Sequence, residues 1–148
     1  MSQRFILKAT GKSFNVVGTH LKAKPKFVDI RSKQCQHLIE TFGSSTDTLI
    51  FGDFNDTPES EPLKMMASTF ASLSSEFAGQ EPEFTTMKFR EYEGMQKRTI
   101  DYIFAAKNFA KVVGSLELPL DADIDQHMAN PCKDHPSDHY SLCFDLQI

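Results

Sequence analysis

LIFGDFNDTP, residues 49–58, is the stretch from which the fold of this chain can be worked out. Residues 48–51 are strand formers and predict a short, buried strand. The residues after it are polar or conformationally permissive, namely Gly52, Asp53, Asn55 and Asp56. Apolar packing does not explain this polarity. The end of the strand is therefore either a capped turn, which Asp and Asn favour, or part of a functional site.

The segments around this strand predict alternating strands and helices, followed by strands alone. A strand at 13–21 precedes a helix at 29–42, with Asp29 as its N-cap and Gly43 as its end. A second helix is expected at 60–70, with Ser60 as its cap. Further strands are expected at 84–89, 98–106, 111–118 and 140–146, with a long acidic loop at 119–137. This order predicts an α/β layered sandwich, in which a mixed sheet carries helices on one face.

Length and composition limit the class of protein. The chain has 148 residues, 40% of them hydrophobic, which fits a single domain over residues 1–148. Its net charge of −4 excludes a polycation that coats nucleic acid, so any contact with phosphate has to be local. Three cysteines without paired spacing, and no leader, favour a cytoplasmic location, with a mitochondrial one also open. No apolar run approaches the roughly 20 residues that span a bilayer, so no membrane partner is expected.

Polar side chains lie at the ends of several predicted strands. In chain order they are His20, Asp53, Asn55, Asp101, Asp138 and His139. Because strand ends meet at one edge of a sheet, these groups are expected to converge. Carboxylates, an amide and imidazoles suit the hydrolysis of a phosphate ester with a hard cation such as Mg²⁺.

Each of these residues also has a structural interpretation. His20 can be solvated at the end of its strand, and Asp138 with His139 can form a loop ion pair. Asp101 is harder to explain in this way, because it stands among strand formers in TIDYIF. A carboxylate without a partner would cost roughly 1–3 kcal/mol there, so Asp101 is expected to reach solvent or a partner.

Five segments together resemble the endonuclease/exonuclease/phosphatase superfamily, and within it the branch of nocturnin-like and carbon-catabolite-repression deadenylases. They are GTHLKAK, IFGDFNDTP, FTT, RTIDYIF and HPSDHYSLCFDL, in that order. The combination of GDFN, TIDYIF and PSDH is specific, and the resemblance extends over nearly the whole chain. It implies a sandwich of the fold that this superfamily shares.

The resemblance implies a role for each residue of the matching motifs. Asp53 and Asn55 would orient and activate the attacking water and hold phosphate or metal. His139 would contact the phosphate, and Asp138 would be a carboxylate on the metal side. The implied metal is Mg²⁺, with Mn²⁺ as an alternative.

Other matching positions would orient the site or bind substrate. Asp101 would position a neighbouring group, and His20 would face the scissile phosphate. Lys22, Lys24 and Arg90 occupy positions where members of this branch have cations for substrate phosphate. Residues 20–33 indeed carry five Lys or Arg against one Asp, which indicates either a local cationic patch or a solvated surface.

The implied activity is that of a metal-dependent phosphoesterase acting by in-line attack of water. Its substrate would be a nucleotide phosphate ester, either the 2′-phosphate of NADP(H) or the 3′ end of poly(A) RNA. The catalytic residues do not distinguish these substrates.

One departure from the family is large. Its members stack two similar sheets, and the first half supplies an Asn and the Glu that is the principal Mg²⁺ ligand. Neither has a counterpart in this sequence. The chain is therefore expected to be the C-terminal half of such a domain, weak or inactive unless the missing half or a second copy completes it.

Three other interpretations remain. Cys132, His135 and His139 have a spacing open to zinc, with His127 as a distant fourth ligand, although Pro136 prevents one helix from presenting the last two histidines. A serine hydrolase is disfavoured because the chain contains no G-x-S-x-G segment. A non-catalytic half-domain that binds a nucleotide or a protein through residues 22–33 is the alternative from another functional class.

Overall fold

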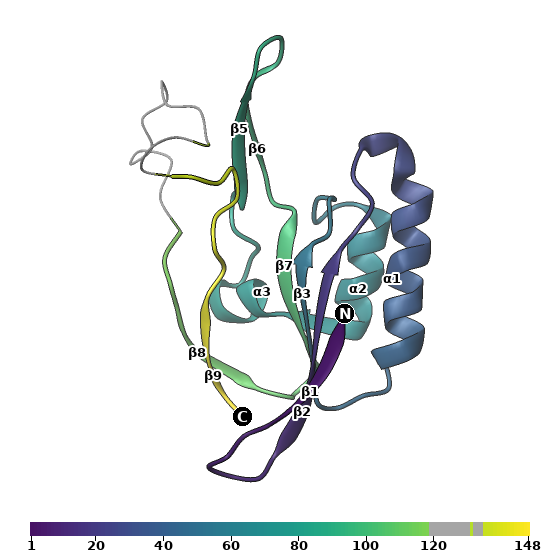
Figure 1. Ribbon diagram of the computed structural model, residues 1–148, viewed down its shortest axis with the longest axis vertical. Coiled ribbons are helices and arrows are strands. Elements are labelled where there is room, and N and C mark those ends of the chain that lie inside the picture. The colour runs from purple at the N-terminus through teal and green to yellow at the C-terminus, as the bar shows by residue number, and fades with distance from the viewer. Residues whose placement is uncertain (119–130, 132–134) are drawn as a thin grey trace.

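The structure is a computed structural model that describes residues 1–118, 131 and 135–148 (Figure 1). Its centre is a five-stranded sheet with the order β1-β2-β3-β7-β4. These strands are Ser2–Ile6 (β1), Ser13–His20 (β2), Thr48–Asp53 (β3), Phe70–Ser72 (β4) and Asp101–Ala106 (β7). β2 and β3 are parallel, and the other neighbouring pairs are antiparallel, so the sheet is mixed.

Helices lie beside this sheet (Figure 1). A 3₁₀ turn at Pro25–Phe27 leads into α1, Val28–Phe42, and α2 spans Glu61–Thr69. Both cover the same face of the sheet. The short helix α3, Leu73–Ala78, contacts β7 and the strand β8, Lys111–Ser115.

Two strand pairs complete the described structure. β5, Thr86–Arg90, and β6, Gly94–Arg98, form a hairpin that projects from the body of the molecule (Figure 1). β8 pairs with β9, Phe144–Gln147, in an antiparallel arrangement.

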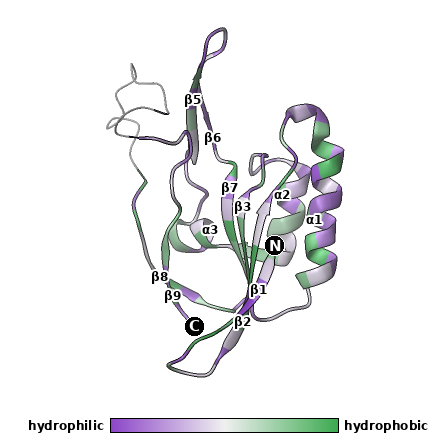
Figure 2. Ribbon diagram, in the orientation of Figure 1, coloured by the Kyte–Doolittle hydropathy of each residue, from purple (hydrophilic) through white to green (hydrophobic). Residues whose placement is uncertain are grey.

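The main core lies between the central sheet and the helices. α1 alternates between hydrophilic and hydrophobic bands along its length, as expected for a helix with one buried face (Figure 2). The core side chains come from both layers: Val17, Ile50, Tyr102 and Phe104 from the strands, and Cys35, Leu38, Leu63 and Met66 from the helices. Successive residues of a strand point to opposite faces, and Phe51, which follows buried Ile50, is 44% exposed. The second face of the sheet is thus open.

A buried ion pair ties α1 to the segment after β3. Arg31 Nε lies 2.7 Å from Asp56 Oδ2, and the Arg31 side chain is 3% exposed. The hydroxyl of Tyr102 lies within hydrogen-bond distance of the carbonyl oxygens of Asp56 and Thr99. Because a charge taken out of water needs a partner, this pair fixes how α1 sits on the sheet.

The structure confirms the predicted α/β class with its mixed sheet and helices on one face. Both predicted helices are present, and Gly43 ends α1 by donating its N–H to the carbonyl oxygen of Ile39. The predicted N-cap is wrong: Phe27 occupies that position, and Asp29 lies in the first turn, where its charge favours the helix dipole. Ser60 does occupy the N-cap of α2, although its hydroxyl makes no capping bond.

Other boundaries differ from the sequence prediction. β1, β4, β6 and α3 were not predicted. β4 and α3 are short, the residues of β1 are all exposed, and β6 lies mostly between the strands expected at 84–89 and 98–106. The strand expected at 140–146 begins only at Phe144, because residues 139–140 pair with β5 instead. Most of the acidic loop at 119–137 lies outside the described residues. In the part of the chain that is described, no helix has the length and apolarity needed to cross a membrane.

We expect Arg31→Met to destabilise the fold by about 3–5 kcal/mol, because it leaves the Asp56 carboxylate buried without its partner. Urea unfolding would measure the loss. Lys33→Met, on the exposed side of the same helix, is the matched control and should stay within about 0.5 kcal/mol of the wild type. Equal stability of the two variants would contradict a structural role for the pair.

Candidate active site

Three predicted site residues lie in one row across the central sheet. His20 of β2 pairs with Asp53 of β3, and Asp53 pairs with Asp101 of β7. Because Ile50 and Tyr102 point to the core, the alternation of strand residues directs Asp53 and Asp101 to the open face. The row therefore faces away from the helices.

The turn after β3 has a geometry that only certain residues adopt. Gly52 has φ +143°, and a Cβ on it would lie 1.9 Å from the carbonyl oxygen of Thr19, so β2 and β3 approach too closely there for a side chain. Asn55 has φ +55°, a left-handed conformation that Asn tolerates. Its backbone N–H donates to Asp53 Oδ1 at 2.7 Å. The capped turn considered from the sequence is thus present, with the Asp53 carboxylate as its acceptor.

Asp53 is the electrostatic centre of this row. Its second oxygen, Oδ2, accepts from the Asn55 amide at 3.1 Å and lies 3.4 Å from His20 Nε2. Burial raises the pKa of Asp53, and the nearby Asp101 carboxylate adds to the rise, while the Asn55 N–H and the two histidines His139 and His20 oppose it. A half-buried carboxylate beside a second one is a site that favours a positive charge.

His139 joins the row from the segment before β9. Its Nδ1 lies 3.0 Å from Asp101 Oδ2. Thr85 holds the other side of this contact, since its hydroxyl donates to Asp101 Oδ2 at 2.7 Å. The same Thr85 oxygen accepts the backbone N–H groups of Ile100 and Asp101, each at 3.0 Å. Asp101 therefore has defined partners, and the Asp101–His139 pair has a fixed orientation.

The start of β5 holds the backbone of the His139 segment. Thr86 forms a β-bridge with His139, and its hydroxyl donates to the carbonyl oxygen of Asp138 at 2.7 Å. The N–H of Tyr140 donates to the carbonyl oxygen of Thr85 at 2.8 Å. Position and direction of the imidazole are thus set by main-chain pairing.

The structure does not bring every predicted residue to this row. The Asp138 carboxylate lies 2.7 Å from Lys88 Nζ, and this hydrogen bond lowers the pKa of Asp138. Arg90 lies at the end of β5, with its guanidinium 3.6 Å from Glu93. Neither residue is part of the group formed by Asp53, Asp101 and His139.

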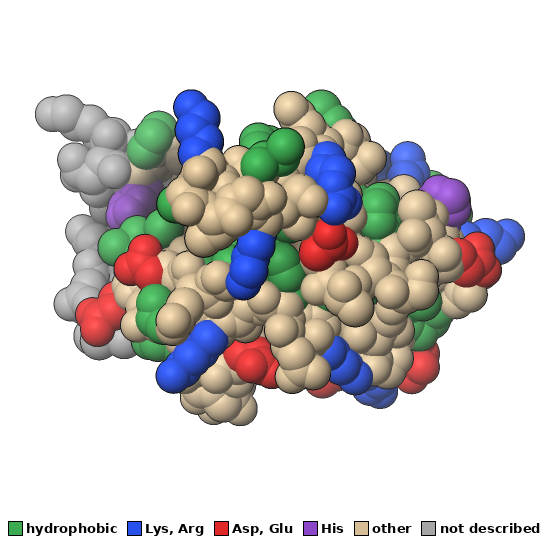
Figure 3. Space-filling view, turned by 90° about the horizontal axis from the view of Figure 1, so that it is seen from below, with side chains coloured by type: hydrophobic (Ala, Val, Ile, Leu, Met, Phe, Trp, Pro, Cys, Tyr) green, Lys and Arg blue, Asp and Glu red, His purple; other side chains and the backbone are tan. Residues whose placement is uncertain are grey.

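The predicted cationic patch is smaller than the sequence indicates. Lys22, Lys24 and Lys26 are exposed, and Lys22 Nζ lies over the ring of Phe27, 5.0 Å from its centroid. Arg31, which was counted with them, is buried and belongs to the ion pair with Asp56. Figure 3 shows the opposite end of the molecule, where basic and acidic side chains are interspersed.

The group at the row suits a divalent cation. Ligand atoms of Asp53, Asp101 and His139 all lie within 4.8 Å of one another. Two carboxylates of like charge at this distance, one of them with a raised pKa, gain from a cation between them. Carboxylate oxygens fit Mg²⁺, whereas a nitrogen ligand is more acceptable to Mn²⁺.

The zinc alternative gains no support from the described residues. The ring of His135 packs against the ring of Tyr140, with centroids 5.2 Å apart, while His139 is bound to Asp101. Cys132 and His127, the other two residues of that alternative, lie outside the described residues.

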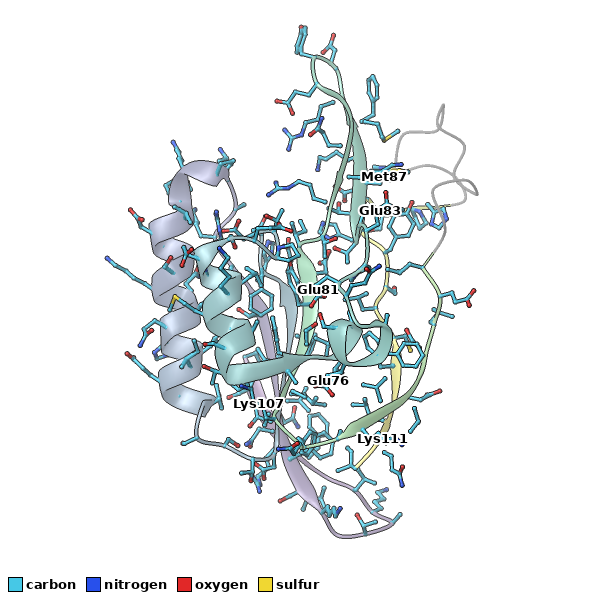
Figure 4. The ribbon with its side chains drawn as sticks, turned by 180° about the vertical axis from the view of Figure 1, so that it is seen from behind. Glu76, Glu81, Glu83, Met87, Lys107 and Lys111 are labelled. Atoms are coloured by element: carbon cyan, nitrogen blue, oxygen red, sulfur yellow. The ribbon has the colours of Figure 1, made fainter. Side chains whose placement is uncertain are left out.

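A larger cavity lies elsewhere, at the edge of the sheet beside α3. Its volume is about 690 Å³, and its lining includes Glu76, Glu81, Lys107 and Lys111 (Figure 4). None of the predicted site residues lines it, so its size does not make it the candidate site. Titratable side chains that contact one another, as they do in the row, indicate a functional site more specifically than the volume of a cavity does.

Sequence reasoning did not assign roles to several residues that build the site. Thr85 was quoted only as part of FTT, and a buried threonine gives no sign of its distant acceptor. Lys88 was not connected to Asp138, which lies 50 positions away. Arg31, in contrast, precedes buried Cys35 and Leu38 by four and seven residues, so its helical spacing placed it on the buried face.

Two human proteins are similar in sequence to this chain over nearly its whole length. Human nocturnin is 33% identical over 159 aligned residues, covering 100% of this chain and 36% of that protein. Human 2′,5′-phosphodiesterase 12 is 29% identical over 171 residues, covering 95% of this chain and 27% of that protein. This chain therefore spans about a third of the length of these relatives.

A solved structure is similar over nearly the whole chain. The human nocturnin catalytic domain with bound sulfate has a TM-score of 0.73 and 27% identity, over 99% of this chain and 51% of that chain. The sequence profile of the Endonuclease/Exonuclease/phosphatase family matches residues 18–139. Because it covers more than half of the chain, this match shows that the chain belongs to the Endonuclease/Exonuclease/phosphatase family.

Proposed function

We propose that this chain is the C-terminal half of a nocturnin-type, metal-dependent phosphoesterase domain. Its substrate would be a nucleotide phosphate ester, either the 2′-phosphate of NADP(H) or the 3′ end of poly(A) RNA. The observation that carries the proposal is the group of Asp53, Asp101 and His139, whose ligand atoms lie within 4.8 Å of one another. The similarity to nocturnin and to 2′,5′-phosphodiesterase 12 supports the same class of reaction.

In this proposal Asp53 orients the attacking water and accepts its proton. Burial and the neighbouring Asp101 carboxylate raise the pKa of Asp53 when no cation is bound, which is the direction expected of a general base. Asn55 holds the carboxylate through two hydrogen bonds, one from its backbone N–H and one from its amide. The same amide donates to the carbonyl oxygen of Leu21, which fixes it relative to β2.

His139 and His20 would stabilise the negative charge that develops on the phosphate. Asp101 engages Nδ1 of His139, which leaves Nε2 for a phosphate oxygen. His20 stands on the other side of Asp53, and its side chain is 72% exposed. Lys22, Lys24 and Arg90 would bind further phosphates of the substrate, as charges of the opposite sign.

Mg²⁺, or Mn²⁺ in its place, would be held at Asp53, with Asn55 as the second ligand that the resemblance implies, and would neutralise charge on the phosphoryl group as a Lewis acid. Asp101 and His139 belong to the same group of ligand atoms but contact each other, so the proposal gives them the phosphate-binding role instead. Asp138 would be a further metal ligand only if its carboxylate left Lys88. This chain offers few carboxylate ligands for the cation, so we expect its metal affinity to be weak unless further carboxylates are supplied.

A non-catalytic binding module is the second candidate. The observation that favours it is the exposure of the lysines in residues 22–26, which would bind a nucleotide or an acidic protein surface without turnover.

Asp53→Asn tests the role of the central carboxylate. The amide oxygen still accepts from the Asn55 N–H, and only the contact with the Asn55 side chain is lost, so we expect a small change in melting temperature. In this chain joined to the first half of a domain of this family, we expect turnover to fall by about 10²- to 10⁴-fold. Asp145→Asn, an exposed carboxylate on β9, is the control. Strong destabilisation by Asp53→Asn would instead show that the carboxylate serves mainly the turn.

Thr85→Val tests the orientation of the Asp101–His139 pair. The change keeps the shape of the side chain but removes the donor to Asp101 and the acceptor of the Ile100 and Asp101 N–H groups. In the same joined chain we expect turnover to fall about tenfold. Thr99→Val is the comparison, because Thr99 is also buried and its hydroxyl donates to the carbonyl oxygen of Pro82. Equal turnover of the two variants would argue against a role for Thr85 in the site.

Completion of the domain separates the two candidate functions. We would measure phosphate release from NADP and AMP release from a short oligo(A), with Mg²⁺, for this chain alone and for the chain joined to the first half of a domain of this family. We expect turnover only in the joined form, with the better substrate identifying the specificity. Nucleotide binding without turnover in both forms would support the binding module.

A further inference from the structure

The backbone of residues 22–24, beside the candidate site, is held by side chains of α1. Arg31 Nη1 donates to the carbonyl oxygens of Lys22 and Lys24, each at 2.9 Å. Gln34, one helical turn later, accepts the N–H of Lys22 at 3.0 Å through its amide oxygen. Three backbone groups of an exposed segment are therefore bound by two side chains of one helix.

This arrangement fixes a conformation that an isolated segment would rarely adopt. Lys24 has φ +81°, a left-handed value that is costly for a residue with a side chain. Its carbonyl oxygen accepts both from Arg31 and from the N–H of Phe27. The hydrogen bonds from α1 offset the local strain, and they define where the side chains of Lys22 and Lys24 leave the backbone.

The same segment is tied directly to the candidate site. The N–H of Leu21 donates to the carbonyl oxygen of Asp53 at 2.8 Å, and the amide of Asn55 donates to the carbonyl oxygen of Leu21 at 3.0 Å. Arg31 also binds Asp56, which follows Asn55. Residues 21–24 and residues 53–56 are thus held together by one network that includes α1.

From these contacts we infer that Arg31 and Gln34 are positioning residues for substrate binding. They set the backbone from which Lys22 and Lys24 present their ammonium groups, so they control how tightly the phosphates of a nucleotide are held. The inference rests on the proposed function, because it assumes that these lysines bind substrate phosphate. It concerns affinity for phosphate groups and leaves the chemistry at Asp53 unchanged.

Gln34 allows this role to be separated from stability. Its amide contacts an exposed backbone N–H, which water can satisfy once the side chain is replaced. Loss of this contact should therefore release the N–H of Lys22 from α1 without unfolding the protein. Arg31 is less suitable as a sole test, since it is also part of the buried ion pair.

The test compares Gln34→Met with Gln36→Met. Both variants replace a glutamine of α1 by a residue of similar shape, and Gln36 donates to the side chain of Glu40 on the same helix. The probe is adenosine 2′,5′-bisphosphate, whose binding requires no turnover, and its dissociation constant is measured by calorimetry on the 148-residue chain. We expect Gln34→Met to weaken binding about fivefold, as the loss of one hydrogen bond implies, and Gln36→Met to bind like the wild type.

Two further readouts distinguish positioning from a structural effect. Melting temperatures of the two variants should agree, and hydrogen exchange at the Lys22 amide should accelerate in Gln34→Met alone. Arg31→Lys keeps the positive charge but cannot reach Asp56 and two carbonyl oxygens as guanidinium does, so it should also weaken binding, with a lower melting temperature.

Equal affinity of Gln34→Met and Gln36→Met would overturn the inference, and so would a wild-type chain that does not bind the bisphosphate. A different result would contradict the proposed function: the joined domain would show no Mg²⁺-dependent hydrolysis, although the bisphosphate binds and its affinity still depends on Gln34.

Discussion

The pairing register of three strands is the constraint on which the candidate site depends. His20, Asp53 and Asp101 are opposite one another in β2, β3 and β7. A shift of one residue in any of these strands would turn an apolar core residue to the open face and a site residue to the core. The buried side chains of Val17, Ile50 and Phe104 therefore do more than stabilise the sheet. By holding the register they decide which polar groups meet.

A second layer of control comes from the helix side of the sheet. Arg31 reaches through the packed layer to Asp56 and to the backbone at Lys22 and Lys24. Because the ion pair is buried, the cost of removing its two charges from water offsets much of its contribution to the free energy of unfolding. Removing one partner would leave the other charge buried and unpaired, so the pair holds its two segments in one arrangement. The Arg31 side chain thus stabilises the packing of α1 and also positions residues next to the site, although the site lies on the opposite face of the sheet.

What the sequence predicts depends on how local the determining contacts are. The strand that ends in GDFN, the helix after THLKAK and the need of Asp101 for a partner could all be predicted, because each follows from residues close in the chain. The identity of that partner set could not, since Thr85 and His139 come from segments 16 and 38 residues away. Asp138 was expected to face a metal by resemblance alone, whereas Lys88 occupies its carboxylate. Arg31 was misassigned to the surface because its charge was weighed and its position on the apolar stripe of α1 was not.

The link between β5 and the segment of His139 has a consequence for the order in which the protein folds. Thr86 and Asp138 are joined across 52 residues, so their contact carries a large loop-closure cost and forms only after more local structure is in place. β2, α1 and β3 follow one another in the chain, so the pairing of His20 with Asp53 closes a shorter loop. Asp101 and His139 both join through longer closures, since β7 pairs with β3 and the His139 segment pairs with β5. We therefore expect the site to become complete only when the last strands of the chain have paired.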